Sequence, residues 1–230
     1  MPGVTNKAMH QPFNEIAKRY DLLNDFMSLG LHRAWKGKLF GWVSQGLNPS
    51  SRVLDLATGT GDVASLFLKK LPAHQIFAAD PSEAMMNEGK KKHPDLTEWH
   101  CARAESLPFP EDFFSVVTCT FGVRNFNNRA FAFREIARTL KKDGKLGILE
   151  IHPIPKSIRY LPFRLFWRFG VPLWGLFFKR LSAYEYLRDT AAQFISPEVM
   201  VEELLPFFHL ERKQALIGGG LVTLIIAKKR

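Results

Sequence analysis

The chain has 230 residues, enough for one sizeable hydrophobic core and short for two independent domains. Its 46% hydrophobic and 23% charged residues are typical of a folded globular protein and exclude a low-complexity chain. Lys and Arg number 32 against 22 Asp and Glu, and the net charge of +10 favours an anionic partner, nucleic acid or an acidic membrane surface.

Short β-rich runs alternate with helical periodicity from about residue 51, a pattern typical of a parallel sheet covered by helices on both faces. Strands are predicted at residues 52–56, 75–79, 97–101, 115–120 and 145–151. Helices are predicted at residues 62–70, after an N-cap at Ser82, at 128–140 and from 196–198, with a turn at 141–144. Residues 207–214 and 221–227 then predict two strands that suit an antiparallel hairpin. The whole predicts a Rossmann-like α/β fold with a mostly parallel seven-stranded sheet and an antiparallel last strand.

Targeting and redox signals are few. Cys101 and Cys119 show neither zinc-ligand spacing nor a disulfide pattern, so we expect no metal site and a cytoplasmic location. The N-terminal residues show no apolar run typical of a secretory signal. The most apolar long stretch, residues 161–178, contains two prolines and two arginines, whereas a spanning helix needs about 20 mostly apolar residues.

Residues 53–62 (VLDLATGTGD) lead from a predicted strand through a glycine turn into a helix. Gly59 and Gly61 let the backbone approach a ligand, and Asp55 is placed to accept hydrogen bonds from an ammonium group, directly or through water. Asp80, at the end of the second strand, can accept hydrogen bonds from both ribose hydroxyls. These features predict a binding site for S-adenosylmethionine, the methyl donor of a large class of transferases.

The glycine loop has two other interpretations. The glycines, followed by Ala64, loosely match the G-x-G-x-x-A pattern of a dinucleotide site. Asp55 argues against that site because a carboxylate would repel a pyrophosphate, whereas it would attract an ammonium and a sulfonium. A glycine turn without function is the third interpretation, and Asp80 makes it the weakest.

Further motifs resemble a more specific family. They are residues 13–24 (FNEIAKRYDLLN) with 28–35 (SLGLHRAW); 104–110 (AESLPFP) with 121–125 (FGVRN); and 149–150 (LE) with 184–187 (YEYL) and 218–220 (GGG). Together they resemble the ubiquinone/menaquinone biosynthesis C-methyltransferase family, which includes the demethylmenaquinone methyltransferases and methylates a ring carbon of a prenylated quinol. The similarity extends over residues 13–227, and the first two groups of motifs are the most selective.

The resemblance implies a class I S-adenosylmethionine-dependent methyltransferase fold and a set of donor contacts. Those contacts fall on Thr60, Asp80, Arg103, Ala104 and Thr120. Arg103 departs from the family, which commonly has Asp or Asn there to accept a hydrogen bond from the adenine amino group; Arg has no acceptor. Either the backbone and a neighbour such as Glu105 replace that bond, or donor affinity is reduced. Thr58 also departs, since the family usually has Gly or Cys there.

Methylation of a ring carbon of a quinol requires removal of a proton from a ring hydroxyl. A phenolic hydroxyl has a pKa of about 10, and its removal makes the adjacent ring carbon nucleophilic. Arg124 is expected to stabilise the phenolate while Asn125 orients the ring, with a surface salt bridge as the alternative for Arg124. The proton is expected to leave through water to Asp21, Glu150 or His152. The predicted catalytic residues are Arg124, Asn125, Asp21, Tyr20 and Glu150; a helix-cap pair is the alternative for Tyr20 and Asp21, and a structural role for His152.

Residues 158–187 interleave aromatic side chains with Arg and Lys, a combination that suits the headgroup region of an anionic membrane. We therefore expect one methyltransferase domain, residues 1–230, with an N-terminal helical cap (1–48) and an aromatic and basic lid (154–195) in peripheral contact with the inner face of the membrane. An aromatic cap on the protein's own core or a homodimer interface is the alternative. A nucleic-acid partner is not expected, because no Asn-Pro-Pro-Tyr-like motif or RNA-binding module is visible.

Rival functions remain at this stage. The chain could methylate another small molecule, or an RNA or protein, or it could be a non-catalytic scaffold with a degenerate donor site marked by Arg103. The sequence leaves the acceptor open between demethylmenaquinol and 2-polyprenyl-6-methoxy-1,4-benzoquinol, together with the length of the prenyl tail.

Overall fold

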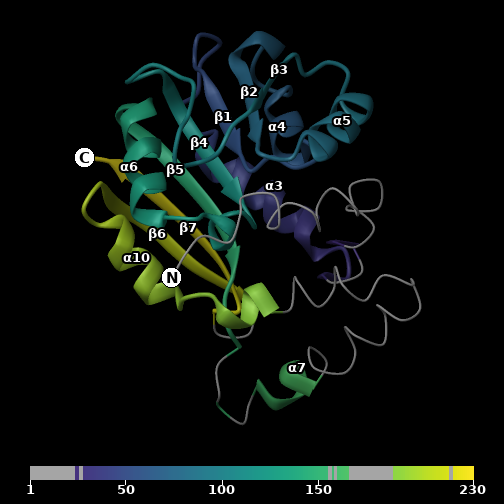
Figure 1. Ribbon diagram of the computed structural model, residues 1–230, viewed down its shortest axis with the longest axis vertical. Helices are drawn as coiled ribbons and strands as arrows, with labels where there is room; N and C mark the ends of the chain where they lie inside the picture. The colour runs from purple at the N-terminus through teal and green to yellow at the C-terminus, as the bar shows by residue number, and fades with distance from the viewer. Residues whose placement is uncertain (1–23, 26–27, 155–156, 158–159, 166–188, 218–219) are drawn as a thin grey trace, which may run out of the picture.

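The computed structural model describes residues 24–25, 28–154, 157, 160–165, 189–217 and 220–230 (Figure 1). Its centre is a seven-stranded sheet in the order β3-β2-β1-β4-β5-β7-β6. The strands are β1 (Val53–Leu56), β2 (Ile76–Asp80), β3 (Glu98–Cys101), β4 (Phe114–Thr120), β5 (Leu140–Ile151), β6 (Phe208–Ile217) and β7 (Val222–Lys229). β7 runs antiparallel to both of its neighbours, and the other pairings are parallel. The predicted sheet with its antiparallel last strand is confirmed.

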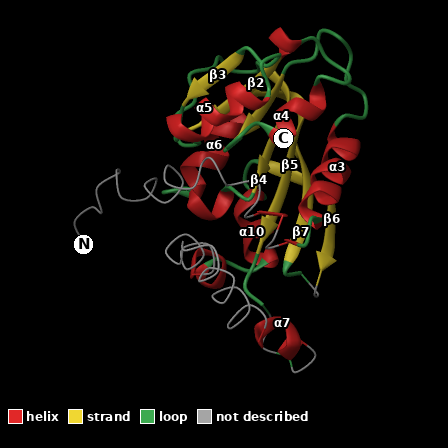
Figure 2. Ribbon diagram, turned by 90° about the vertical axis from the view of Figure 1, so that its right-hand side faces the viewer, coloured by secondary structure: helices red, strands yellow, loops and turns green. Residues whose placement is uncertain are grey.

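Helices cover both faces of this sheet (Figure 2). They are α3 (Leu31–Val43), α4 (Asp62–Phe67), α5 (Glu83–Lys92), α6 (Arg129–Thr139), α7 (Leu161–Leu165) and α10 (Pro197–Leu204), with short 3-10 helices η2 (Ala73–Gln75) and η3 (Val123–Asn125). α3 and α4 bury apolar residues in one core cluster, and α6 and α10 bury theirs in a second. Successive β1 residues alternate between them, since Val53 belongs to the first cluster and Leu54 to the second.

The predicted helix starts are confirmed by their caps. Ser82 accepts a hydrogen bond from the Met85 amide, and Asn128 caps α6 by accepting one from Phe131. Ser196 accepts one from Val199 and is followed by Pro197 at the first helical position. These side chains satisfy backbone amides that have no partner inside the helix.

The predicted turn at residues 141–144 is instead an interruption within β5. Leu140 pairs with Phe114 and Lys145 pairs with Val116, so four residues bulge out of one continuous strand. Asp143 occupies the bulge with a φ of 64° and forms an ion pair with Lys228 of β7. The bulge therefore accommodates the left-handed residue without ending the strand.

The two proposed accessory segments are described only in part. α3 belongs to the predicted cap, and α7, at the lower end of both views, belongs to the predicted lid (Figures 1 and 2). Residues 1–23 and 166–188 lie outside the described residues. Among the helices that are described, none combines the length and the apolar character needed to cross a membrane.

Candidate functional site

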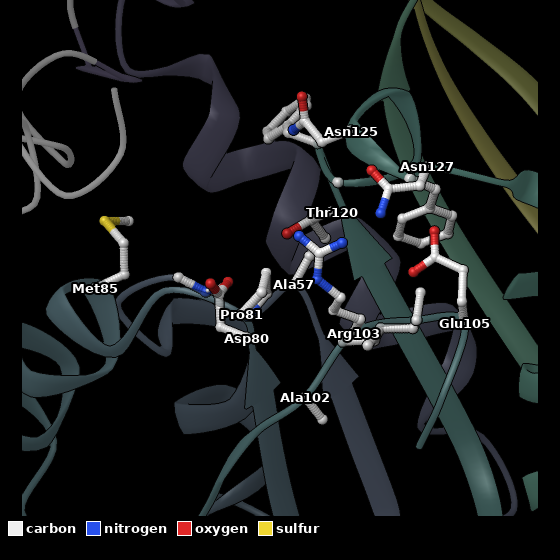
Figure 3. Close-up of a pocket in the computed structure, with 16 residues that line it drawn as sticks. Ala57, Asp80, Pro81, Met85, Ala102, Arg103, Glu105, Thr120, Asn125 and Asn127 are labelled. Atoms are coloured by element: carbon white, nitrogen blue, oxygen red, sulfur yellow. Dashed lines mark hydrogen bonds between the residues drawn. The ribbon is translucent and has the colours of Figure 1, made fainter. Parts of the chain in front are cut away.

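A pocket opens at the carboxyl ends of β1, β2 and β4, where the strand order reverses between β1 and β4. Open α/β sheets bind ligands at such a point because the loops leave toward opposite faces. Four segments line the pocket: Leu56, Ala57 and Gly59; Asp80, Pro81 and Met85; Ala102, Arg103, Ala104 and Glu105; and Thr120, Phe121, Gly122, Asn125, Phe126 and Asn127. Figure 3 shows this arrangement.

The structure brings most of the predicted donor contacts together in this pocket. Gly59, Asp80, Arg103, Ala104 and Thr120 all line it. The predicted contacts Asp55, Thr60 and Gly61 are close in sequence but are not among the lining residues.

Asp80 is the buried carboxylate of the pocket. One of its oxygens accepts a hydrogen bond from the Gly59 amide at 2.9 Å, and the other accepts one from the Ser82 amide at 2.8 Å. Burial raises the pKa of Asp80 to about 6, and the nearby Asp55 charge adds to the effect. A carboxylate offers about four acceptor positions, so Asp80 can still accept two hydrogen bonds from a ligand.

Asp55 lies behind the loop and is engaged by the protein. One oxygen accepts hydrogen bonds from the Thr58 hydroxyl at 2.7 Å and the Ala64 amide at 3.1 Å. The other accepts one from the Thr118 hydroxyl at 2.7 Å. Burial raises its pKa to about 6, although these bonds oppose the shift. Asp55 therefore supports the loop directly, through hydrogen bonds to residues on both sides of it.

The two glycines of the loop have different surroundings. Gly59 has a φ of 58° and faces the pocket. Gly61, with a φ of 83°, faces away, because a Cβ there would lie 2.7 Å from the Trp99 ring of β3. Gly59 thus opens the backbone to a ligand, whereas Gly61 permits close packing between α4 and β3.

Arg103 lines the pocket from the connection between β3 and β4, and Figure 3 draws its side chain between Asp80 and Glu105. A guanidinium group there can donate hydrogen bonds but cannot accept one from a base amino group. Glu105 and Asn127 lie near it on the pocket wall and supply acceptor atoms. The sequence suggests the backbone and Glu105 as one alternative for the missing acceptor, reduced donor affinity being the other, and it gives no indication of Asn127.

Arg124 and Glu150 form a buried ion pair at the ends of β4 and β5. Arg124 Nη1 donates to Glu150 Oε1 at 2.6 Å, and the side chains are 3% and 0% exposed. Glu150 also accepts hydrogen bonds from the Arg124 and Ile151 amides. The salt bridge considered as the alternative for Arg124 is therefore present, but it is buried and does not lie on the surface. Both carboxylate oxygens of Glu150 are thus engaged by donors of the protein itself.

The remaining predicted catalytic residues fall in different places. Asn125 follows Arg124 in η3 and lines the pocket itself. His152 is buried, with Nδ1 2.9 Å from the Ile195 carbonyl and Nε2 2.6 Å from the Thr223 hydroxyl. Because a carbonyl only accepts, Nδ1 donates and Nε2 is occupied as the acceptor, which fits a structural role. Tyr20 and Asp21 lie outside the described residues.

Two residues at or near the pocket were not predicted, although features of the sequence could have indicated both. Met85 lines the pocket from the first turn of α5, and its place follows from the Ser82 cap that precedes it. Lys36 of α3 is buried and donates to Asp62 at the start of α4, 2.9 Å away. A lysine on the inward face of a helix that also presents Leu39 and Val43 is the signal that could have found it.

Comparison with known proteins gives a family-level match. A sequence profile of the ubiE/COQ5 methyltransferase family matches residues 1–211. The demethylmenaquinone methyltransferase of Thermotoga maritima is 38% identical over 205 residues, 88% of each chain. The ubiquinone/menaquinone biosynthesis C-methyltransferase UbiE of Citrifermentans bemidjiense is 36% identical over 229 residues, 94% of each chain. The mitochondrial 2-methoxy-6-polyprenyl-1,4-benzoquinol methylase of Caenorhabditis elegans is 34% identical, covering 81% of this chain and 67% of its own.

Solved structures share the fold at much lower identity. A SAM-dependent methyltransferase of Thermotoga maritima aligns with a TM-score of 0.66 at 20% identity, over 96% of this chain and 100% of its own. Geranyl diphosphate C-methyltransferase of Streptomyces coelicolor, solved with S-adenosyl-L-homocysteine, aligns with a TM-score of 0.64 at 13% identity, over 87% and 80%. These likenesses establish the class I methyltransferase architecture.

Proposed function

Because this chain belongs to the ubiE/COQ5 methyltransferase family, we propose that it transfers a methyl group from S-adenosylmethionine to a ring carbon of a prenylated quinol. The observation that carries the proposal is the family match over most of the chain, combined with an acidic strand end and a glycine loop in one pocket. This chain is similar both to a relative named as a demethylmenaquinone methyltransferase and to one named as a benzoquinol methylase. We therefore propose demethylmenaquinol, 2-polyprenyl-6-methoxy-1,4-benzoquinol or both as the acceptor.

The pocket residues fit the proposed donor. Asp80 retains acceptor positions for two ribose hydroxyls, while Met85 and Ala104 offer apolar contact for a flat base. Asp55 and Asp80 place two carboxylates beside the loop, which favours a ligand carrying an ammonium and a sulfonium over one carrying a pyrophosphate. When bound, S-adenosylmethionine supplies a methyl group activated by the positive sulfur.

Arg124 is proposed to stabilise the phenolate form of the quinol. Its pairing with Glu150 fixes the guanidinium in one orientation and also offsets part of its charge. Asn125, which follows it and lines the pocket, is placed to orient the ring next to the donor. Since Glu150 and His152 are already engaged by protein donors, we assign the departing proton to water and to Asp21, with Tyr20 as its proposed neighbour.

One observation favours a second function. Arg103 extends into the pocket and brings a positive charge toward the place proposed for a cationic donor (Figure 3). A scaffold subunit that has lost donor binding would tolerate such a residue. Isothermal titration with S-adenosylmethionine separates the two functions, because the scaffold predicts no binding.

The methyl-transfer experiment uses the full chain, labelled donor and either reduced short-chain demethylmenaquinol or its benzoquinol counterpart. We expect a new methyl group on ring carbon, detected by NMR of the product, with Asp80→Ala as the inactive control. Donor binding without transfer to either quinol would instead indicate a methyltransferase of another small molecule.

We also propose that the cap (residues 1–48) and the lid (154–195) contact an anionic membrane around this site in a single domain, residues 1–230. Four exposed leucines support the proposal: Leu29 (80% exposed) just before α3, Leu31 (44%) at the start of α3, and Leu161 (41%) and Leu165 (47%) in α7. Exposed leucines near basic residues suit a headgroup boundary. The alternative is that a second copy covers them as a homodimer.

Flotation with liposomes tests the membrane proposal. We expect the protein to float with anionic vesicles and to remain behind with neutral ones, and Leu161→Glu combined with Leu165→Glu should weaken flotation. If the protein floats with neither type of vesicle, packing on the protein's own core or dimerisation would explain the exposed leucines, and sedimentation would then identify a dimer.

A further inference from the structure

The inward face of α3 changes character along its length. Leu39 and Val43 are fully buried against the sheet, whereas Lys36, about one turn before Leu39, and His32, about two turns before it, are also buried but polar. Lysine is almost never buried unless it is paired. The position of Lys36 on this face therefore requires a partner that the core itself does not provide.

That partner is Asp62, the first residue of α4. Lys36 Nζ lies 2.9 Å from Asp62 Oδ2, and Lys92 Nζ of α5 lies 2.5 Å from Asp62 Oδ1. Burial alone would raise the pKa of Asp62, but the two lysines lower it well below its usual range. One ionised carboxylate thus joins α3, α4 and α5, and it also suits the positive end of α4.

The start of α4 is the end of the donor loop. Gly61 precedes Asp62 and donates its amide to the Thr58 carbonyl at 3.0 Å, while the Gly59 amide donates to Asp80. Asp55 holds the first turn of α4 from the other side through the Ala64 amide. A shift of Asp62 would therefore move the backbone that lines the pocket.

We infer that Lys36 is a positioning residue for the donor site: through Asp62 it fixes the first turn of α4, and with it the Gly59 loop, against the N-terminal helix. The inference rests on the proposed donor binding at that loop. On this inference, the polar half of α3 couples the N-terminal segment to the pocket without contacting the ligand.

Removal of the Lys36 charge should be tolerated by the fold. In Lys36→Met the side chain remains apolar and of similar length, and Asp62 keeps Lys92 and the helix terminus as partners. Lys38→Met is the matched control, because Lys38 lies on the same helix but contacts the Trp42 ring instead of Asp62. Lys36→Arg keeps the charge and should restore the ion pair.

The test measures the dissociation constant of S-adenosylhomocysteine by titration and the KM of the donor in steady state. We expect Lys36→Met to weaken binding and raise the donor KM by about tenfold with a smaller change in kcat, Lys36→Arg to recover most of the loss, and Lys38→Met to match the unaltered protein. Should Lys36→Met fail to fold, Asp62→Asn, which preserves volume and weakens the same pair, is expected to show the same loss.

The outcomes separate this inference from the proposed function. If the unaltered protein does not bind S-adenosylhomocysteine, the donor site itself is wrong and the inference fails with it. If the unaltered protein binds and either Lys36→Met or Asp62→Asn binds equally well, Lys36 has no positioning role. A loss that Lys36→Arg does not reverse would also overturn the inference, because packing alone would explain it.

Discussion

Asp55 and Asp80 are two buried carboxylates that carry a cost in the absence of a ligand. Burial is the main cause that raises the pKa of each to about 6, and the charge of Asp55 contributes to the value of Asp80. Their hydrogen bonds to the loop and to Thr118 offset only part of that cost. Such groups are typical of sites where function rather than stability selects the residue.

Asp55→Asn should stabilise the ligand-free protein near neutral pH. The amide oxygen can keep the Thr58 and Ala64 bonds, and the amide nitrogen can donate to the Thr118 hydroxyl. Because the folded pKa of Asp55 is raised, the contribution of this residue to stability is fully present below its ordinary pKa and is lost as pH rises through about 6. Urea unfolding should show a gain on the order of 2 kcal/mol above about pH 7 that disappears near pH 4. A gain that does not depend on pH would argue against a buried charge.

The proposed role of Arg124 can be tested by substitution, but its buried ion pair with Glu150 limits the choice of variant. Arg124→Ala would leave Glu150 buried without its cation, which costs about 3–5 kcal/mol in comparable pairs. The double variant Arg124→Gln with Glu150→Gln removes both charges and is the better reagent. We expect its affinity for S-adenosylhomocysteine to stay the same while turnover falls by at least about tenfold, measured with the quinol assay. Unchanged turnover would remove Arg124 from the mechanism.

Residue types and strand ends were enough to predict much of the pocket. Gly59 and Asp80 line it, as the glycine turn and the end of the second strand predict, whereas Ala104 and Thr120 were expected only from the family resemblance. The hydrogen-bond partners of a buried group could not be predicted from the sequence. Asp55, for example, accepts a hydrogen bond from Thr118, a residue of another strand 63 positions away. For the same reason the sequence did not indicate the Arg124–Glu150 pair.

At the level of elements, predicted strands agree with the structure within one to a few residues, whereas helix ends and irregular pairing were less predictable. α4 ends at Phe67, three residues before the predicted limit of residue 70. β5 extends back to Leu140 because a bulge absorbs residues that read as a turn. Residues 68–70 continue α4 as a tighter turn, in which the Lys69 and Lys70 amides donate to the carbonyls three residues earlier, and the β5 bulge depends on pairing with β4 that a local pattern does not encode.

The contact between α3 and β5 predicts how two glycine substitutions change the stability of the fold. A Cβ at Gly147 of β5 would lie 2.6 Å from Val43 Cγ1 and 2.8 Å from Leu39 Cδ1, so Gly147→Ala should destabilise the fold by about 1–3 kcal/mol through overpacking. Gly37, on the outer face of α3, has no atom near its Cβ position, and Gly37→Ala should stabilise the helix by about 0.5–1 kcal/mol. Chemical denaturation measures both. Equal effects of the two substitutions would contradict the close packing of α3 on the sheet.

At the scale of the whole molecule, the order of the strands creates the site. β1 lies between β2 and β4, so the loops after these three strands meet at one edge although they are separated by up to 64 residues along the chain. α3 and α4 on one face, and α6 and α10 on the other, hold that edge from both sides. Ligand binding there should consequently stabilise the sheet and its helices together.

Thermal unfolding with S-adenosylhomocysteine measures this coupling. A ligand at about 100 times its dissociation constant stabilises by about 2.7 kcal/mol, which corresponds to about 5–10 °C for a chain of this size. Its ammonium and ribose hydroxyls bind best when Asp55 and Asp80 are ionised, and with pKa values of about 6 both are largely protonated near pH 5. At the same ligand concentration, the shift in Tm should therefore be roughly halved near pH 5 compared with about pH 8, as expected for an affinity about tenfold weaker. Asp80→Asn should reduce both the shift and its pH dependence, because Asp80 lines the pocket. Equal shifts at the two pH values in the unaltered protein would mean that the ligand does not depend on these carboxylates, and the site would have to lie elsewhere.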